Sequence, residues 1–303
     1  MSEYELLIAK ARTLIAEDKI EEAITIYQKA FLIDSTVDDF LDLGFLYLEV
    51  KSYSLAFEVF SSVIKMDSQN ARGFHGLGLW YEKNENYPLA ITNMQIALSL
   101  DAFNTDMMLD LAEMYELNQE ITLAEDCYLK IIALKPDHFW ANLNLGSLYE
   151  TQDKLEEALN YTKKAYTIDA NMKMVAYNLG VIYARFGKYE EAIQCYKQEI
   201  SKEDGYYHAY YNLGIIYKDI YQDYEQAKLY YLQGISKNKE NYLCWYNLGC
   251  VYALSQNFQE ATNCIYYAIY HYPQLINDIE EDKDLSEYRK SEEYPRLLQW
   301  LKK

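Results

Sequence analysis

The sequence has few of the residues that interrupt helices. Eleven glycines and four prolines among 303 residues favour long helices joined by short turns over a β-sandwich or barrel, and they argue against a Pro/Gly-rich linker. No apolar run reaches the roughly 18 residues of a membrane span. Residues 1–19 are charged and lack the apolar stretch of a secretory signal. We therefore expect a cytoplasmic protein without membrane insertion.

Positive charge is scarce as well. Lys and Arg number 28 against 47 Asp and Glu, and the net charge is −19. This acidity opposes binding to nucleic acid and to anionic membranes, because both are polyanions, but it permits basic partners. The five cysteines include no CxxC pair, so we expect neither a disulfide framework nor a zinc site.

Internal repetition is what the sequence has in abundance. Tyrosines recur every 34 or 35 residues: Tyr47, Tyr81, Tyr115, Tyr149, Tyr183, Tyr217 and Tyr252. Each follows Leu-Gly-x-x, with Ala112 replacing the glycine once. Leu and Tyr four residues apart share one helix face. A glycine inside a helix costs about 1 kcal/mol relative to alanine, which is reasonable where a neighbouring helix must approach closely.

The second half of each repeat is marked by an alanine. The fourth residue after this alanine is large in all repeats except one, where it is Thr162; the others are Tyr27, Phe60, Met94, Tyr128, Tyr196, Tyr231 and Ile265. We call it the alanine-plus-four residue. Turn residues such as IDS, MDS and LKP close the units. The pattern predicts two helices of about a dozen residues in each repeat.

This two-helix unit resembles the tetratricopeptide repeat family, whose pattern is W-x2-L-G-x2-Y…A-x3-F…A…P. The eighth unit matches best, with Trp245, Leu248, Gly249, Tyr252, Ala261, Ala268 and Pro273. The resemblance implies an all-α, right-handed superhelical solenoid of about eight units that binds other proteins. The expected units are about 4–36, 37–70, 71–104, 105–138, 139–172, 173–206, 207–241 and 242–275. Residues 276–303 resemble the C-terminal segment of bacterial end-of-group modules of this family, and we expect an acidic linker and a capping helix there.

The resemblance also predicts which side chains line a binding groove. We number each repeat so that Leu-Gly occupies positions 7 and 8; positions 2, 5, 6, 9, 12 and 13 of the first helix then face a concave groove. Position 6 is asparagine in the last four repeats: Asn144, Asn178, Asn212 and Asn247. Tyr177, Tyr211 and Tyr246 occupy position 5, and Trp140 position 2. An amide can pair with both a peptide N–H and a C=O, so we predict an Asn/Tyr ladder that binds an extended peptide or protein segment.

The N-terminal half of the predicted groove is acidic. Asp42, Asp110 and Glu113 lie on it and would favour a basic segment. Arg12 and Arg72 are isolated, so the clamp with which some family members bind acidic chaperone tails is not expected. The four histidines lie in different repeats, and no Gly-rich phosphate loop is present. We therefore predict a non-catalytic interaction scaffold with no cofactor and no metal site.

Several alternatives stay open at the level of sequence. The asparagines could bond to the preceding turn or to the neighbouring repeat, and the acidic stripe could be an ordinary solvated face. The protein could instead be a self-associating structural subunit whose groove is filled by its own tail or by a second copy. A regulatory or recruiting subunit of a separate enzyme is a third possibility.

Overall fold

The computed structural model describes residues 1–203 and 205–301, and all regular elements within these ranges are helical. First helices alternate with second helices along the chain. The first helices are α1 (Glu3–Ala16), α3 (Val37–Glu49), α5 (Ala71–Lys83), α7 (Thr105–Leu117), α9 (Phe139–Thr151), α11 (Val175–Arg185), α13 (His208–Ile215) and α15 (Tyr242–Leu254). The second helices are α2 (Ile20–Ala30), α4 (Tyr53–Met66), α6 (Tyr87–Leu100), α8 (Ile121–Leu134), α10 (Leu155–Ile168), α12 (Tyr189–Ile200), α14 (Tyr224–Lys237) and α16 (Phe258–His271).

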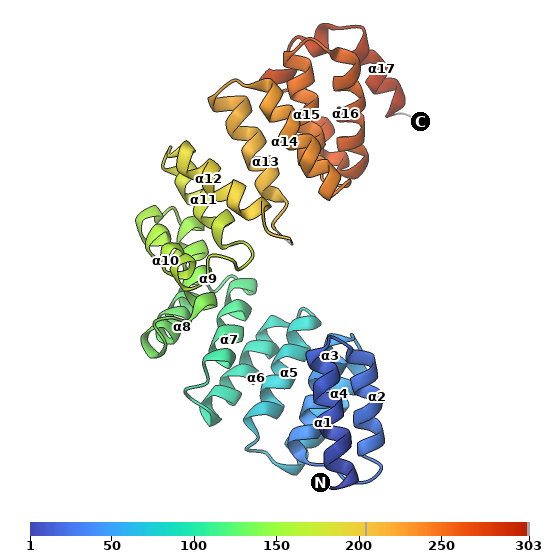
Figure 1. Ribbon diagram of the computed structural model, residues 1–303, viewed down its shortest axis with the longest axis vertical. Coiled ribbons are helices and arrows are strands. Elements are labelled where there is room, and N and C mark those ends of the chain that lie inside the picture. The colour runs from blue at the N-terminus through green and yellow to red at the C-terminus, as the bar shows by residue number, and fades with distance from the viewer. Residues whose placement is uncertain (204, 302–303) are drawn as a thin grey trace. The chain divides into compact units, whose positions relative to one another are not determined.

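The chain divides into two compact units, Met1–Leu145 and Gly146–Lys303, with the boundary inside α9. Within each unit, the second helix of one hairpin packs against the first helix of the next, as α4 does on α5 and α12 on α13 (Figure 1). First helices also contact first helices, for example α3 with α5 and α13 with α15. They therefore share one face of each unit, which we call the first-helix face. These paired helices confirm the predicted all-α repeat architecture.

The glycine of Leu-Gly is where the two helices of a hairpin come closest. A Cβ atom added to Gly180 would lie 2.7 Å from the ring of Tyr196, and one added to Gly214 only 2.2 Å from the ring of Tyr231. These rings are the alanine-plus-four side chains, and they are buried. The missing side chain therefore makes room for a large residue on the partner helix, as the pattern predicts.

The hairpin turn is closed by the carbonyl of the repeat tyrosine. In the fifth repeat, Tyr149 accepts the N–H of Lys154, five residues along, at 2.9 Å. The seventh repeat is one residue longer, and there Tyr217 accepts from Asp223, six residues along, at 2.8 Å. A single π-helical turn, η1 (Ile216–Ile220), continues α13 and takes up the extra residue. A π-turn of this kind lengthens a helix locally by one residue per turn.

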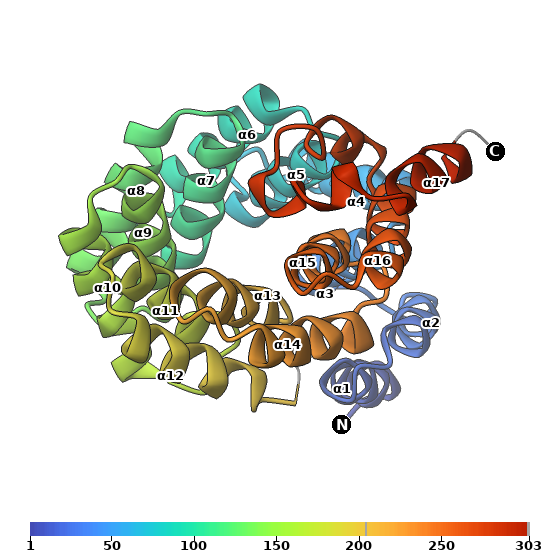
Figure 2. The same cartoon turned by 90° about the horizontal axis from the view of Figure 1, so that it is seen from above.

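The predicted capping helix is present at the C-terminus. Helix α17 (Glu293–Trp300) packs against α16, as Figures 1 and 2 both show, and Leu297 is fully buried. The predicted acidic linker is itself folded into short 3₁₀ turns, η2 (Pro273–Asn277), η3 (Lys283–Leu285) and η4 (Tyr288–Lys290). Leu285 and Tyr288 are also fully buried. Among the described residues, no helix combines the length and apolar character that crossing a membrane requires.

The acidic segment is held against the first-helix face at α15 by polar contacts. The carboxylate of Asp282 accepts a hydrogen bond from the hydroxyl of Tyr246 at 2.7 Å. Asp284 forms an ion pair with Lys218, which η1 carries and which is only 7% exposed. Burial lowers the pKa of Lys218, but its hydrogen bonds to Asp284 and Asp219 outweigh this effect, so the net pKa is raised. The tail and the seventh repeat are therefore fastened by a charge pair.

Replacing Lys218 with methionine should loosen this segment. The change leaves Asp284 without its cation, and we expect the segment's local stability to fall by about 2 kcal/mol. Hydrogen exchange of the amides between residues 279 and 290 measures this. Lys290→Met is the control, because the ammonium of Lys290 pairs with Glu287 on the exposed surface and should contribute less than about 0.5 kcal/mol. Equal protection in the two variants would contradict the role given to Lys218.

Candidate functional site

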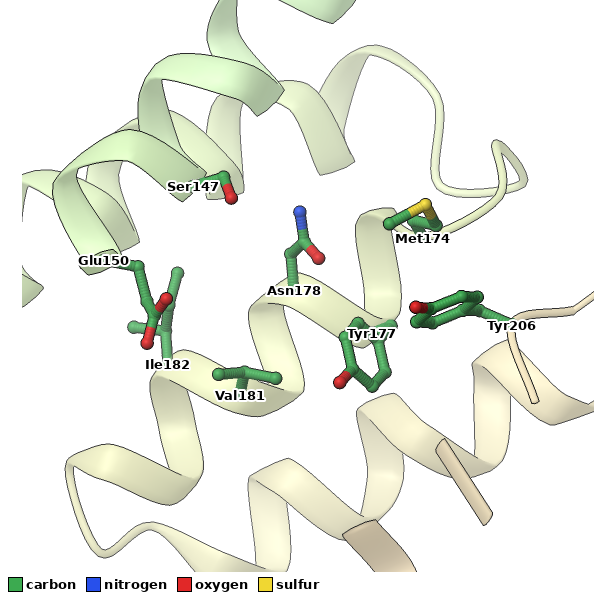
Figure 3. A pocket seen from close by; sticks show the side chains of 8 residues that line it. All are labelled: Ser147, Glu150, Met174, Tyr177, Asn178, Val181, Ile182 and Tyr206. Carbon is green, nitrogen blue, oxygen red and sulfur yellow. The ribbon is translucent and has the colours of Figure 1, made fainter. Parts of the chain in front are cut away.

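The first-helix face of the second unit contains a pocket of about 250 Å³. It is lined by Ser147 and Glu150 of α9, by Tyr177, Asn178, Val181 and Ile182 of α11, and by Met174 and Tyr206 from the loops. Figure 3 shows Asn178 extending from α11 into this space, with Ser147 and Glu150 on one side and Met174 and Tyr206 on the other. Two residues of the predicted ladder, Tyr177 and Asn178, thus meet in one concave site.

The pocket exists partly because α11 begins late. Five of the first helices start at a Ser, Thr or Asn whose side chain accepts a backbone N–H, as Asn70 and Asn104 do. Helix α11 lacks such a cap and begins after Met174, which has a left-handed backbone with φ of +70°. A non-glycine residue in this region needs support from its surroundings.

The carboxylate of Glu199 supplies that support. Glu199 is fully buried on α12, and its Oε1 accepts the backbone N–H of Met174 at 2.8 Å and that of Tyr206 at 3.1 Å. Its Oε2 pairs with Lys202 at 2.8 Å. Lys202 in turn donates to the carbonyl of Met172 at 2.6 Å. One buried ion pair therefore fixes both loops that wall the pocket.

Aromatic contacts order the wall further. The ring of Tyr177 meets that of Tyr206 edge-on, with centroids 4.8 Å apart, and Tyr206 stacks on His208 at 4.6 Å. Burial raises the pKa of the Tyr177 hydroxyl and lowers that of the His208 imidazole. Both rings are therefore neutral at physiological pH, and the wall presents apolar faces with polar edges.

The carboxylate in the pocket is already partly neutralised. Arg185 donates to Oε1 of Glu150 and to its backbone carbonyl, each at 2.5 Å, and also to Asp153 at 2.6 Å. A single guanidinium nitrogen, Nη1, therefore orients Glu150, while Nη2 is directed to Asp153. One carboxylate oxygen carries that contact, which leaves acceptor capacity on the other.

The four asparagines of the predicted ladder are not equivalent. Asn144 donates to Glu113 at 3.2 Å, Asn212 donates to the hydroxyl of Tyr196 at 3.2 Å, and Asn247 turns back to the carbonyl of Leu243 at 3.0 Å. The side chain of Asn178 has no hydrogen-bond partner within the described residues. Asn178 is therefore the ladder amide that is available to a ligand.

Two ladder residues are covered by the chain itself. Tyr246 is 8% exposed and donates to Asp282 of the C-terminal segment, and Asn247 is 9% exposed. Because the segment occupies the Tyr246 hydroxyl and Asn247 is buried and bonded within α15, we leave both out of the candidate site. Tyr211 is half-buried beside the ring of Tyr231, and Trp140 lies elsewhere, in an open depression with His138 and Lys135.

The predicted acidic residues of the first unit have partners within that unit. Asp42 pairs with Arg72 at 2.5 Å, and Asp110 pairs with His75 at 2.6 Å. Glu113 accepts a hydrogen bond from the Asn144 amide, and its pKa is raised by desolvation and by the nearby charge of Asp110. Desolvation also raises the pKa of Glu116. Glu113 and Glu116 are therefore the carboxylates of this stripe whose charge is disfavoured by their surroundings.

Several residues of the pocket are not in the sequence-based set. Ser147 and Glu150 occupy positions 9 and 12 of the groove stripe, so the repeat numbering could have identified them. Met174, Tyr206 and Glu199 have no such signal, because the first two lie in irregular loops and the third lies on a second helix. The exceptional Thr162 is the one clue that the fifth repeat differs from the others.

Comparisons with known proteins agree with this architecture. Four models described as tetratricopeptide repeat match residues 4–36, 75–139, 127–160 and 175–205. No curated protein matches the sequence. The structure of pilF from Pseudomonas aeruginosa is similar, with a TM-score of 0.60 and 20% identity over 67% of this chain and 92% of that one.

The Cut9–Hcn1 hetero-tetramer of the APC/C is also similar, with a TM-score of 0.66 and 16% identity. The match covers 94% of this chain and 55% of that one, so the present chain spans about half of that relative. At these identities the two structures show the fold alone. Scaffold families built from such repeats are generally non-catalytic.

The matched segments and the stack of paired helices lead to the same conclusion. Repeats of this type present a continuous surface for protein partners rather than one enclosed active site. The chain belongs to the tetratricopeptide repeat family and is a protein-interaction scaffold.

Proposed function

We propose that the protein binds an extended segment of a partner protein on the first-helix face of its second unit, centred on the pocket around Tyr177 and Asn178. The observation that carries this proposal is the free amide of Asn178, which extends into the pocket while the other ladder amides are satisfied internally. An Asn amide can hold a peptide N–H and C=O together, whatever side chains the peptide carries.

A second depression continues the site along the same face. It has a volume of about 310 Å³, is lined by Arg185, Asn212, Ile215 and Ile216 among others, and shares Val181 with the first pocket. Packed helices lie about 8–10 Å apart, and an extended chain advances roughly 3.3 Å per residue. Residues about three apart in the partner segment would therefore lie over neighbouring depressions.

The proposed site has a limit at the C-terminal end of the first-helix face. At α15 the chain's own acidic segment lies over Tyr246. A partner segment would therefore run over α9, α11 and α13 and stop at the C-terminal segment. The alternative that the protein's own tail fills the groove is therefore supported only over α15.

A basic stretch in a partner would be attracted to the first unit. Glu113 and Glu116 lie near Asp110 and Glu82, and the pKa of Glu113 is raised by desolvation and by these neighbouring carboxylates. A Lys or Arg side chain placed there would relieve their repulsion. Such a contact would speed association and favour basic partners more than it would add affinity.

The double variant Tyr177→Ala, Asn178→Ala should weaken segment binding at least tenfold. It removes an aromatic contact and a pair of hydrogen bonds, which together contribute about 2–3 kcal/mol. Peptides selected from a displayed library against the wild-type protein supply the ligand, and fluorescence anisotropy measures the dissociation constant.

The matched control is Asn247→Ala, the same change at a ladder position that is buried and bonded within its own helix. We expect it to leave peptide affinity within about twofold. Unchanged binding in the double variant, or equal losses in both variants, would rule out the pocket as the centre of the site.

Binding of Lys/Arg-containing peptides should depend on salt and pH through Glu113 and Glu116. Their pKa values are raised on folding, so they are protonated at a higher pH than ordinary glutamates, and the attraction fades as the pH falls through these values. Over the same interval the first unit should become more stable, because a charge that folding disfavours is removed. The variant Glu113→Gln, Glu116→Gln should reduce the dependence of peptide affinity on salt concentration. If affinity falls with salt as steeply as in the wild type, these carboxylates do not belong to the site.

Replacing Glu199 with alanine should disorder the pocket walls. The change leaves Lys202 and two backbone N–H groups without their acceptor, and we expect unfolding free energy to fall by about 3 kcal/mol. The amides of Met174 and Tyr206 should lose hydrogen-exchange protection first. Glu191→Ala, an exposed change on the same helix, should stay within about 0.5 kcal/mol of wild type. Intact protection in the Glu199 variant would show that the loops are held by other contacts.

A further inference from the structure

The junction between the fourth and fifth repeats is filled by three polar side chains. Tyr128, the alanine-plus-four residue of α8, is fully buried and donates its hydroxyl to Glu116 at 2.5 Å. Glu116 occupies position 12 of the same repeat. The amide of Asn144, at position 6 of the next repeat, lies beside the same hydroxyl and opposes the rise in its pKa that burial causes. A phenol, a carboxylate and an amide thus meet at this junction.

The sixth repeat repeats part of the arrangement. Tyr196 is buried against Gly180, and its hydroxyl accepts a hydrogen bond from Asn212, at position 6 of the following repeat. The sequence interval from Tyr128 to Asn144 equals that from Tyr196 to Asn212, because both span 16 residues. At these two junctions the asparagine at position 6 therefore lies at the tyrosine hydroxyl of the preceding repeat, whereas Asn247 turns back to the carbonyl of Leu243.

The fifth repeat lacks this tyrosine. Thr162 stands in its place, fully buried, and its hydroxyl has no hydrogen-bond partner among the residues that the structure describes. Asn178, again 16 residues along, is the amide left without a partner. Glu150, at position 12, corresponds to Glu116. Both Glu150 and Asn178 line the pocket, so the pocket lies where the phenol of a tyrosine would end.

We propose that this pocket receives a tyrosine side chain from the bound segment, which takes the place of the internal tyrosine that the fifth repeat lacks. The inference rests on the proposed function and names the side chain that the site selects. Asn178 would donate to the phenol oxygen, and the phenol would donate to the free oxygen of Glu150. Val181 and the edges of Tyr177 and Tyr206 would contact the ring.

Size and charge favour an unmodified tyrosine. The volume of about 250 Å³ is below the roughly 300–1,000 Å³ of pockets for small-molecule ligands, and it suits one side chain. Phenylalanine would leave Asn178 and the second carboxylate oxygen of Glu150 without a partner, which a polar site disfavours strongly. A phosphorylated tyrosine would bring negative charge against Glu150, while Arg185 is already engaged by Glu150 and Asp153.

Titration of the full chain with p-cresol, the tyrosine side-chain analogue, tests the proposal. We expect saturable shifts of the Asn178 side-chain amide in ¹⁵N NMR spectra, and binding at least tenfold weaker for toluene and for phenyl phosphate. Equal binding of toluene, or no shift at Asn178, would overturn the inference.

Two variants connect the binding to the missing tyrosine. In Thr162→Tyr the internal phenol should occupy the pocket, since the facing residue Gly146 has no side chain, just as Gly180 has none opposite Tyr196. The folded variant should then lose p-cresol binding. If this variant does not fold, Glu150→Gln and Asn178→Ala serve instead, each lowering p-cresol affinity about tenfold, with Asn247→Ala as the control. Unchanged affinity in a folded Thr162→Tyr or in both single variants would overturn the proposal.

The outcomes separate this inference from the proposed function. If library peptides require Tyr177 and Asn178 but p-cresol does not bind, segment binding stands and the tyrosine subsite fails. If p-cresol binds at Asn178 but the double variant Tyr177→Ala, Asn178→Ala binds library peptides as tightly as wild type, the subsite stands and the proposed function fails. If both hold, selected peptides should contain a tyrosine whose change to phenylalanine costs about tenfold in affinity.

Discussion

The close packing of the Leu-Gly position against the alanine-plus-four side chain is the contact on which each hairpin depends. Glycine at this place removes the atoms that would collide with a buried ring, as at Gly180 and Gly214. The ring then reaches past its own repeat, and in the fourth and sixth repeats its hydroxyl meets the amide of the next one. The same residue thus fills a hairpin and joins it to its neighbour.

The candidate site arises where this contact is reduced. Thr162 is too short to reach the next repeat, so the amide of Asn178 and the carboxylate of Glu150 face an open pocket instead of a phenol. The surrounding loops are held in place by the buried pair of Glu199 and Lys202, which keeps the walls ordered without a ligand. A preorganised polar pocket loses less entropy on binding than a mobile one.

A one-residue insertion has a comparable effect at the other end of the second unit. The π-turn η1 absorbs it, and Lys218, which this turn carries, pairs with Asp284 of the tail. This pair and the hydrogen bond from Tyr246 to Asp282 hold the acidic segment on α15. The tail therefore ends the accessible part of the first-helix face, although its composition alone is that of a solvated linker.

The sequence by itself determined the repeat, the two-helix unit, the buried alanine-plus-four residues and the C-terminal helix, because periodic packing imprints itself on residue spacing. It also identified Tyr177 and Asn178. It could not rank the four asparagines, since which amide is satisfied depends on side chains from neighbouring repeats. The tertiary structure decided that Asn178 is free and that Tyr246 is covered. It also brought Met174 and Tyr206 to one pocket through a buried carboxylate, a long-range contact that no local pattern encodes.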